Sequence, residues 1–64
     1  MNIEQDREGF ILRATRKELS MINNALNEIC HGIHVSDFET RVGATLAEAE
    51  ALLERVHAAL ARSR

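Results

Sequence analysis

The sequence predicts a small, mainly helical domain: about three helices at residues 16–31, 37–42 and 46–61, preceded by a short strand at residues 10–14. Two kinds of local signal carry this prediction. A hydroxyl residue followed three positions later by Glu, which is typical of a helix start, occurs at residues 15–18 (TRKE), 36–39 (SDFE) and 45–48 (TLAE). Gly32 and Gly43 follow the first two expected helices, where a left-handed residue commonly closes a helix. We expect residues 1–8 to form a flexible N-terminal segment and residues 9–64 to form the domain.

The strand is expected because Gly9 opens a short apolar run that ends where the first helix starts. A competing interpretation treats this run as one more turn of the following helix. Because a single strand is not stable alone, the strand needs a partner. That partner would be either residues 33–35 or the same strand of a second chain.

The first and third expected helices carry matching apolar stripes, and the second is short, with Phe38 and Val42 on one side. Apolar positions three and four residues apart lie on one face of a helix. They are Leu19, Ile22, Leu26 and Ile29 in the first helix, with Ile33 just past its end, and Leu46, Ala49, Leu53, Val56 and Leu60 in the third. This pattern predicts that the first and third helices pack antiparallel and that the short helix closes the pair.

The size of the chain favours self-association. A domain this short buries only about 60% of the surface that its unfolded chain exposes, and its core supplies only about 3–5 kcal/mol. The single cysteine, Cys30, cannot form an internal disulfide. The third helix also carries more apolar surface than one partner covers, although its alanines are also simply the best helix formers. We therefore expect a homodimer, with its interface at Phe10, Leu12, Leu52, Val56 and Ala59.

The composition argues against several classes of protein. A formal net charge of −2 gives no global attraction to nucleic acid or to an anionic membrane. No apolar stretch approaches the roughly 20 residues that span a bilayer, and a lone cysteine fits a reducing compartment. We expect a cytoplasmic protein with no membrane partner. Cys30, His31 and His34 lack the ligand spacing of a zinc site, and the chain has no phosphate-binding loop. We expect no metal, no cofactor and no enzymatic activity.

The polar side of the first helix is the candidate partner-binding surface. Asn has low helix propensity because its short amide competes for backbone hydrogen bonds, so several Asn in one helix weaken it without structural return. Either these residues are tolerated drift, or they form a hydrogen-bonding strip for a protein partner or a small ligand. On the side away from the apolar stripe lie Ser20, Asn24, Asn27 and His31, with Asn23 at the edge and Arg41 and His34 as bordering residues.

Two DNA-binding families share features with this chain. Residues 38–53 resemble a helix-turn-helix, with Gly43 in the turn and with Phe38, Val42, Ala49 and Leu52 at its interior positions. The matching base-reading positions offer few of the long polar side chains that read bases; they are Thr45, Leu46, Ala47, Glu50 and Ala51. Residues 10–15 resemble the start of a ribbon-helix-helix protein, in which one strand from each of two chains pairs and enters the major groove. That resemblance implies nucleic-acid contacts at Arg13, Arg16 and Lys17, although here an extra helix intervenes.

The sequence therefore predicts a small protein–protein interaction module, a regulator, inhibitor or immunity-type binder, that acts as a homodimer. The alternative is a small DNA-binding transcriptional regulator that uses a paired N-terminal ribbon or the helix-turn-helix-like segment, although the charge disfavours nucleic acid as a partner. A third hypothesis is a small-ligand binder that uses the Asn-rich helix face. Residues 24–28 (NALNE) and 38–41 (FETR) are similar to stretches of small bacterial proteins. This similarity adds nothing to the prediction of function.

Overall fold

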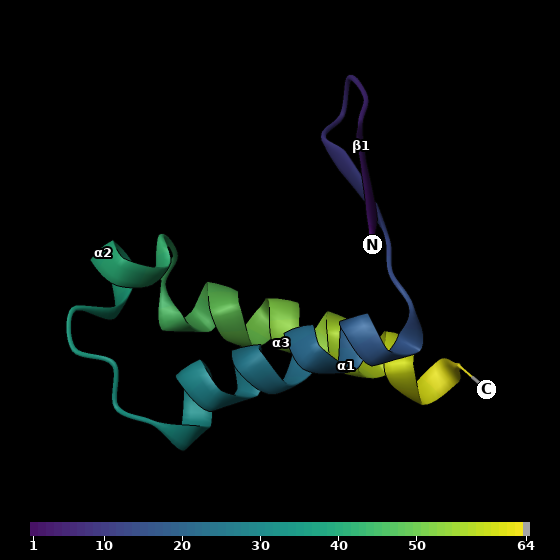
Figure 1. Ribbon diagram of the computed structural model, residues 1–64. Coiled ribbons are helices and arrows are strands. Elements are labelled where there is room, and N and C mark those ends of the chain that lie inside the picture. Colours follow the sequence, from purple (N-terminus) through teal and green to yellow (C-terminus); the bar gives the residue numbers. More distant parts are fainter. Residues whose placement is uncertain (64) are drawn as a thin grey trace.

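The computed structural model describes residues 1–63 and shows an N-terminal hairpin followed by helices (Figure 1). In chain order the elements are β1 (Asn2–Gln5), β2 (Phe10–Arg13), α1 (Arg16–Asn27), the π-helix η1 (Glu28–Gly32) that continues α1, α2 (Phe38–Val42) and α3 (Leu46–Arg62). The mainly helical fold class, the strand before the first helix and the order of the helices are confirmed. Among these residues, no helix combines the length and the apolar character needed to cross a membrane.

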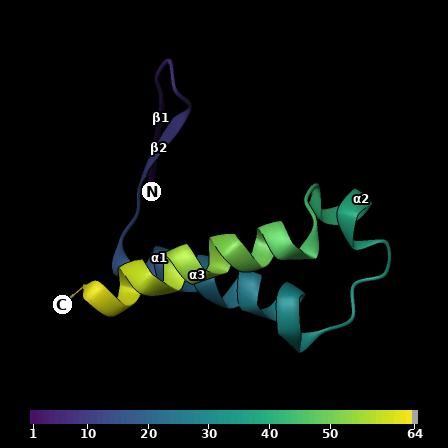
Figure 2. The same cartoon turned by 180° about the vertical axis from the view of Figure 1, so that it is seen from behind.

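The first and last long helices, α1 and α3, lie side by side and run in opposite directions, as views from both sides show (Figures 1 and 2). Ala49 is the only buried side chain in the described part of the chain, with 4% of its surface exposed. Around it the middle of each predicted stripe is half-buried: Leu19, Ile22, Leu26 and Ile29 on one side, and Leu53, Val56 and Leu60 on the other. We call this contact the α1–α3 seam.

The ends of the two stripes depart from the prediction. Ile33 is 54% exposed and Leu46 is 44% exposed. Ile33 lies outside the helical seam because its backbone is extended, with φ −123° and ψ 159°. The seam is therefore shorter than the pattern of apolar residues indicates.

Two of the three helix-start signals form as predicted. Thr15 accepts a hydrogen bond from the Glu18 N–H (3.1 Å) and the Glu18 carboxylate accepts one from the Thr15 N–H (2.8 Å). The same reciprocal pair joins Thr45 and Glu48, at 3.1 and 2.9 Å. The prediction for Ser36 is wrong, because α2 begins one residue later, behind Asp37. Asp37 is left-handed (φ 53°, ψ 48°) and makes no side-chain cap, whereas a capping side chain normally sits on an extended backbone.

The two predicted helix-closing glycines also differ. Gly43 has φ 84° and ends α2 through its N–H bond to the Glu39 carbonyl, as predicted. Gly32 is not left-handed. Its helix ends instead in a wide π-turn, in which the Ile33 N–H donates to the Glu28 carbonyl at 2.9 Å. The π-turn satisfies that carbonyl without a left-handed residue.

Neither predicted partner of the strand is the one observed. β2 pairs antiparallel with β1, with Ile3 opposite Leu12 and Glu4 opposite Ile11. The loop that joins them is closed by Asp6. Its carboxylate accepts from the N–H groups of Glu8 (2.8 Å) and Gly9 (3.0 Å), and its own N–H donates to the Gly9 carbonyl (2.9 Å). The hairpin projects away from the helix pair (Figures 1 and 2).

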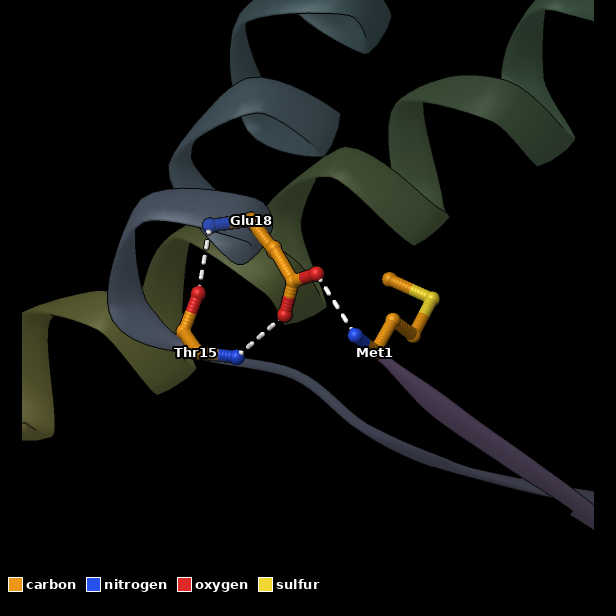
Figure 3. Close-up of polar contacts among 3 residues, drawn as sticks. All are labelled: Met1, Thr15 and Glu18. Carbon is orange, nitrogen blue, oxygen red and sulfur yellow. Dashed lines mark hydrogen bonds and ion pairs between the residues drawn. The ribbon is translucent and has the colours of Figure 1, made fainter.

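The base of the hairpin is held to α1 by the N-terminal amino group (Figure 3). The Met1 ammonium donates to Oε2 of Glu18 at 2.6 Å, while Oε1 of the same carboxylate closes the Thr15 cap. The hydrogen bond from the amino group, with a smaller contribution from the Thr15 N–H, lowers the pKa of Glu18 to about 2. The Glu18 carboxylate thus caps the start of α1 and also holds the N-terminal end of β1 beside it.

The conformations of the two glycines predict opposite effects of adding a methyl group. Gly43→Ala forces a left-handed Ala and should destabilise the fold by about 1–2 kcal/mol. Gly32→Ala should be neutral or stabilise by up to about 1 kcal/mol, since the added Cβ meets only the mobile end of the Glu28 side chain. Urea unfolding followed by circular dichroism measures both. Equal destabilisation by the two variants would contradict the assigned backbone conformations.

The double role of Glu18 predicts a specific pH dependence. Because its folded-state pKa lies below the ordinary 4.5, its stabilisation is complete above about pH 4.5 and is lost as the pH falls toward about 2. Glu18→Gln should therefore reduce the difference in urea midpoint between about pH 7 and about pH 3. Glu48→Gln is the matched control, since Glu48 occupies the same cap position but its pKa is lowered only by Thr45. An equal reduction in both variants would show that the amino group contributes nothing.

Candidate partner-binding groove

A hollow of about 400 Å³ runs between α1 and α3 beside the seam. It combines amide, imidazole, carboxylate and apolar groups from helices that are far apart in the sequence. We call it the α1–α3 groove; its lining residues are Asn23, Asn27, His31, Leu53, Glu54, His57 and Ala58.

The groove forms because residues four apart stay on nearly one side of a helix. Asn23, Asn27 and His31 follow this spacing along α1 and η1. The π-helix η1 has a wider turn than an α-helix, and such turns are frequent at functional sites. Within η1, the His31 side chain reaches α3, with its Nε2 3.8 Å from Oε2 of Glu50. This contact brings η1 and α3 together beside the groove.

The most informative atom in the groove is Oδ1 of Asn23. It is buried, and no hydrogen-bond donor among residues 1–63 reaches it. A buried acceptor without a partner costs about 1–3 kcal/mol. A donor from outside the chain can reach this oxygen only after the Asn23 side chain rotates toward the groove, and pairing would then recover that free energy.

The neighbouring cysteine has the properties of an inert thiol. Cys30 is half-buried in η1. Burial, with a smaller contribution from the Glu50 carboxylate, raises the pKa of Cys30. Since the thiolate is the nucleophile and the metal ligand, this environment keeps the sulfur protonated. Among the described residues, no group of His, Cys, Asp and Glu is arranged to hold a metal ion.

The structure divides the predicted polar strip. It brings Asn23, Asn27 and His31 together at the groove, on the side that faces α3 rather than away from it. It leaves four members outside: Ser20, which is half-buried, and Asn24, His34 and Arg41, which are exposed. The α3 members of the groove were missed, since only the pairing of two distant helices brings them beside α1; they are Leu53, Glu54, His57 and Ala58.

The residues predicted for a dimer interface also differ among themselves. Phe10, Leu12 and Leu52 are 67%, 54% and 51% exposed. Val56 and Ala59 are half-buried, and Val56 belongs to the seam within the chain. Its side chain is therefore partly used by the monomer.

Of the basic residues predicted to contact nucleic acid, Arg16 has a structural role. Its guanidinium donates to the Leu60 carbonyl at 3.3 Å and to the Ser63 hydroxyl. This places a positive charge at the C-terminus of α3, where it complements the helix dipole. Arg13 and Lys17 are exposed.

A second hollow, of about 480 Å³, lies where α2 meets α3, and three carboxylates line it: Asp37, Glu39 and Glu48. Glu48 is already bonded to Thr45.

Comparisons of the whole chain with protein-family models, curated proteins and solved structures found no match. The functional argument therefore depends on the surface of this molecule.

The unpaired oxygen predicts that removing the Asn23 side chain stabilises the fold. Asn23→Ala should raise the free energy of unfolding by about 1–2 kcal/mol, because an unsatisfied acceptor is lost and Ala has higher helix propensity. Asn24→Ala is the matched control. Asn24 is exposed on the same helix, so only the propensity gain of about 0.5 kcal/mol applies. Urea unfolding measures the free energy of unfolding of both variants. Equal gains in Asn23→Ala and Asn24→Ala would mean that Oδ1 of Asn23 is already satisfied.

Proposed function

We propose that this protein is a non-enzymatic protein–protein interaction module that acts as a homodimer and holds a polypeptide segment of its partner in the α1–α3 groove. A regulator, an inhibitor or an immunity-type binder would work in this way. The observation that carries the proposal is the buried, unpaired Oδ1 of Asn23 in that groove. Its cytoplasmic location stays a prediction.

The groove chemistry suits a polypeptide. Once the Asn23 side chain turns toward the groove, its oxygen can accept from a backbone N–H of the bound segment, and the Asn27 amide both donates and accepts. Leu53 and Ala58 offer apolar contact beside these amides. Glu54 adds a negative charge that favours a basic side chain on the partner. The partner is thus a segment with a free backbone donor, a small apolar side chain and a basic residue.

One observation favours a second candidate, a small polar ligand in the same groove. Its volume of about 400 Å³ falls within the range of about 300–1,000 Å³ that is typical of small-molecule sites. A small molecule with a hydrogen-bond donor would satisfy Asn23 equally well.

DNA binding has less support. The polar face of the hairpin carries Asn2, Glu4, Ile11 and Arg13, and the Glu4 carboxylate would repel the phosphates that Arg13 attracts. Arg16 is occupied at the end of α3. In the helix-turn-helix-like segment, Thr45 is bonded within its own cap.

Selection of peptides by the folded protein tests the proposal. A random peptide display library is selected on the wild-type chain, and the enriched peptides are then measured against variants by fluorescence anisotropy. Asn23→Ala and Asn27→Ala should each weaken binding at least about tenfold, which corresponds to one lost hydrogen bond of about 1.4 kcal/mol. Asn24→Ala and Ser20→Ala, which lie outside the groove, should leave binding unchanged.

Two results would contradict the proposal. One is enrichment of peptides that bind all four variants as well as the wild type. The other is no enrichment over an unselected library. Because Asn23→Ala is expected to stabilise the fold, a loss of binding in that variant cannot be attributed to unfolding.

A further inference from the structure

The chain exposes more surface than a compact monomer of its mass. Its accessible surface is 5321 Å² for 7.2 kDa, whereas a compact folded monomer of this mass exposes ~4,100 Å². The excess is roughly 1,200 Å² per chain. A standard protein–protein interface buries about 800 Å² on each partner, so the excess is large enough to form one.

Much of the exposed apolar surface lies on the hairpin. In the register of β1 and β2, opposite residues share a face and alternate residues change face, so Ile3, Phe10 and Leu12 lie on one side. They are 59%, 67% and 54% exposed. A hairpin of two strands is at best marginally stable in water, and a third strand or a covering layer stabilises it. The hairpin therefore has neither the additional strands nor the covering layer that would stabilise it and bury its apolar face.

We propose that a second copy of this chain supplies the missing strands. The two copies of β2 pair antiparallel, which forms a four-stranded sheet. The inference deepens the homodimer part of the proposed function by assigning its interface. It is independent of the α1–α3 groove.

The pattern of backbone hydrogen bonds leaves β2 with a free edge. The Asp6 N–H bonds to the Gly9 carbonyl, and in an antiparallel pair the bonded positions alternate. In this register the backbone groups of Ile11 and Arg13 point toward β1. Those of Phe10 and Leu12 therefore point away from β1, toward the open edge, where a second strand can bond to them.

Side-chain chemistry selects β2 over β1 and also selects the register. Self-pairing of β1 would oppose two carboxylates if centred on Glu4, which is unfavourable, and would set Asn2 opposite Glu4 if centred on Ile3, so neither register pairs apolar side chains throughout. Self-pairing of β2 centred on Ile11 sets Phe10 opposite the second copy's Leu12 and Ile11 opposite the second copy's Ile11. All these side chains are apolar, and aromatic–aliphatic pairs of this kind stabilise a sheet. The apolar faces of both hairpins then lie on one side of the sheet and exclude water together.

Cysteine cross-linking tests both the strand and the register. In a Cys30→Ala background, Ile11→Cys would place two sulfurs across the twofold axis with Cα atoms about 4.5 Å apart, within reach of a disulfide. Glu4→Cys is the matched control, because Glu4 is the direct partner of Ile11 on the same face of the hairpin. In the proposed sheet its two copies lie three strand spacings apart, about 14 Å. After mild oxidation we expect a covalent dimer of Ile11→Cys and none of Glu4→Cys.

Light scattering after gel filtration supplies the second readout. The wild type should be a dimer, and the double variant Phe10→Thr with Leu12→Thr should be a monomer. Met21→Gln is the matched control and should remain a dimer, because Met21 is similarly exposed (63%) but lies on α1. Thr keeps strand propensity, and unchanged helical circular dichroism shows that the helix pair is intact.

The outcomes separate this inference from the proposed function. A monomeric wild type at every concentration would overturn both the interface and the homodimer. A dimer that survives the Phe10 and Leu12 substitutions, or that cross-links through Glu4→Cys, would overturn the interface alone. Peptide binding in the groove is measured separately, and its loss or retention in the Asn variants bears on neither result.

Discussion

The packing of α1 against α3 is the contact on which the rest of the structure depends. Ala49 is its most buried residue among residues 1–63, and a small side chain at such a position lets two helix backbones approach. The approach has three consequences: it sets the walls of the groove, it places His31 beside Glu50, and it brings Arg16 to the C-terminus of α3. The hairpin in turn depends on α1, through the bond between Met1 and Glu18. The groove would not exist without this helix pair.

Features that depend on near neighbours in the chain could be predicted from the sequence. The caps at Thr15 and Thr45 and the left-handed Gly43 each involve bonds between residues three or four apart. The failures lie where the local signal was ambiguous or where the energy of a whole segment decides. Ser36 fails because α2 begins behind a left-handed Asp37, and Gly32 fails because a π-turn satisfies the helix end. β1 could not be predicted since Ile3 is its one apolar residue, and it forms only by pairing with β2.

The candidate site was half visible in the sequence. The concentration of Asn in one helix indicated a polar surface, and Asn23 and Asn27 do line the groove. The sequence interpretation placed Asn27 away from the apolar stripe and Asn23 at the edge, because the spacing was judged against the apolar stripe of one helix alone. The π-turn moves His31 toward α3, and His57 and Glu54 join the site from the other helix. The period of 3.6 residues shows which residues share a face of a helix. It does not show which neighbouring element packs against that face.

The scarcity of buried side chains has a thermodynamic consequence. The heat capacity change of unfolding arises mainly from newly exposed apolar surface. In residues 1–63 only Ala49 is buried, and the other seam residues are half-buried. The single chain is therefore expected to have a small heat capacity change of unfolding, which makes its stability curve shallow. Its small size also gives it a small total enthalpy of unfolding, so we expect it to melt over a broad temperature range.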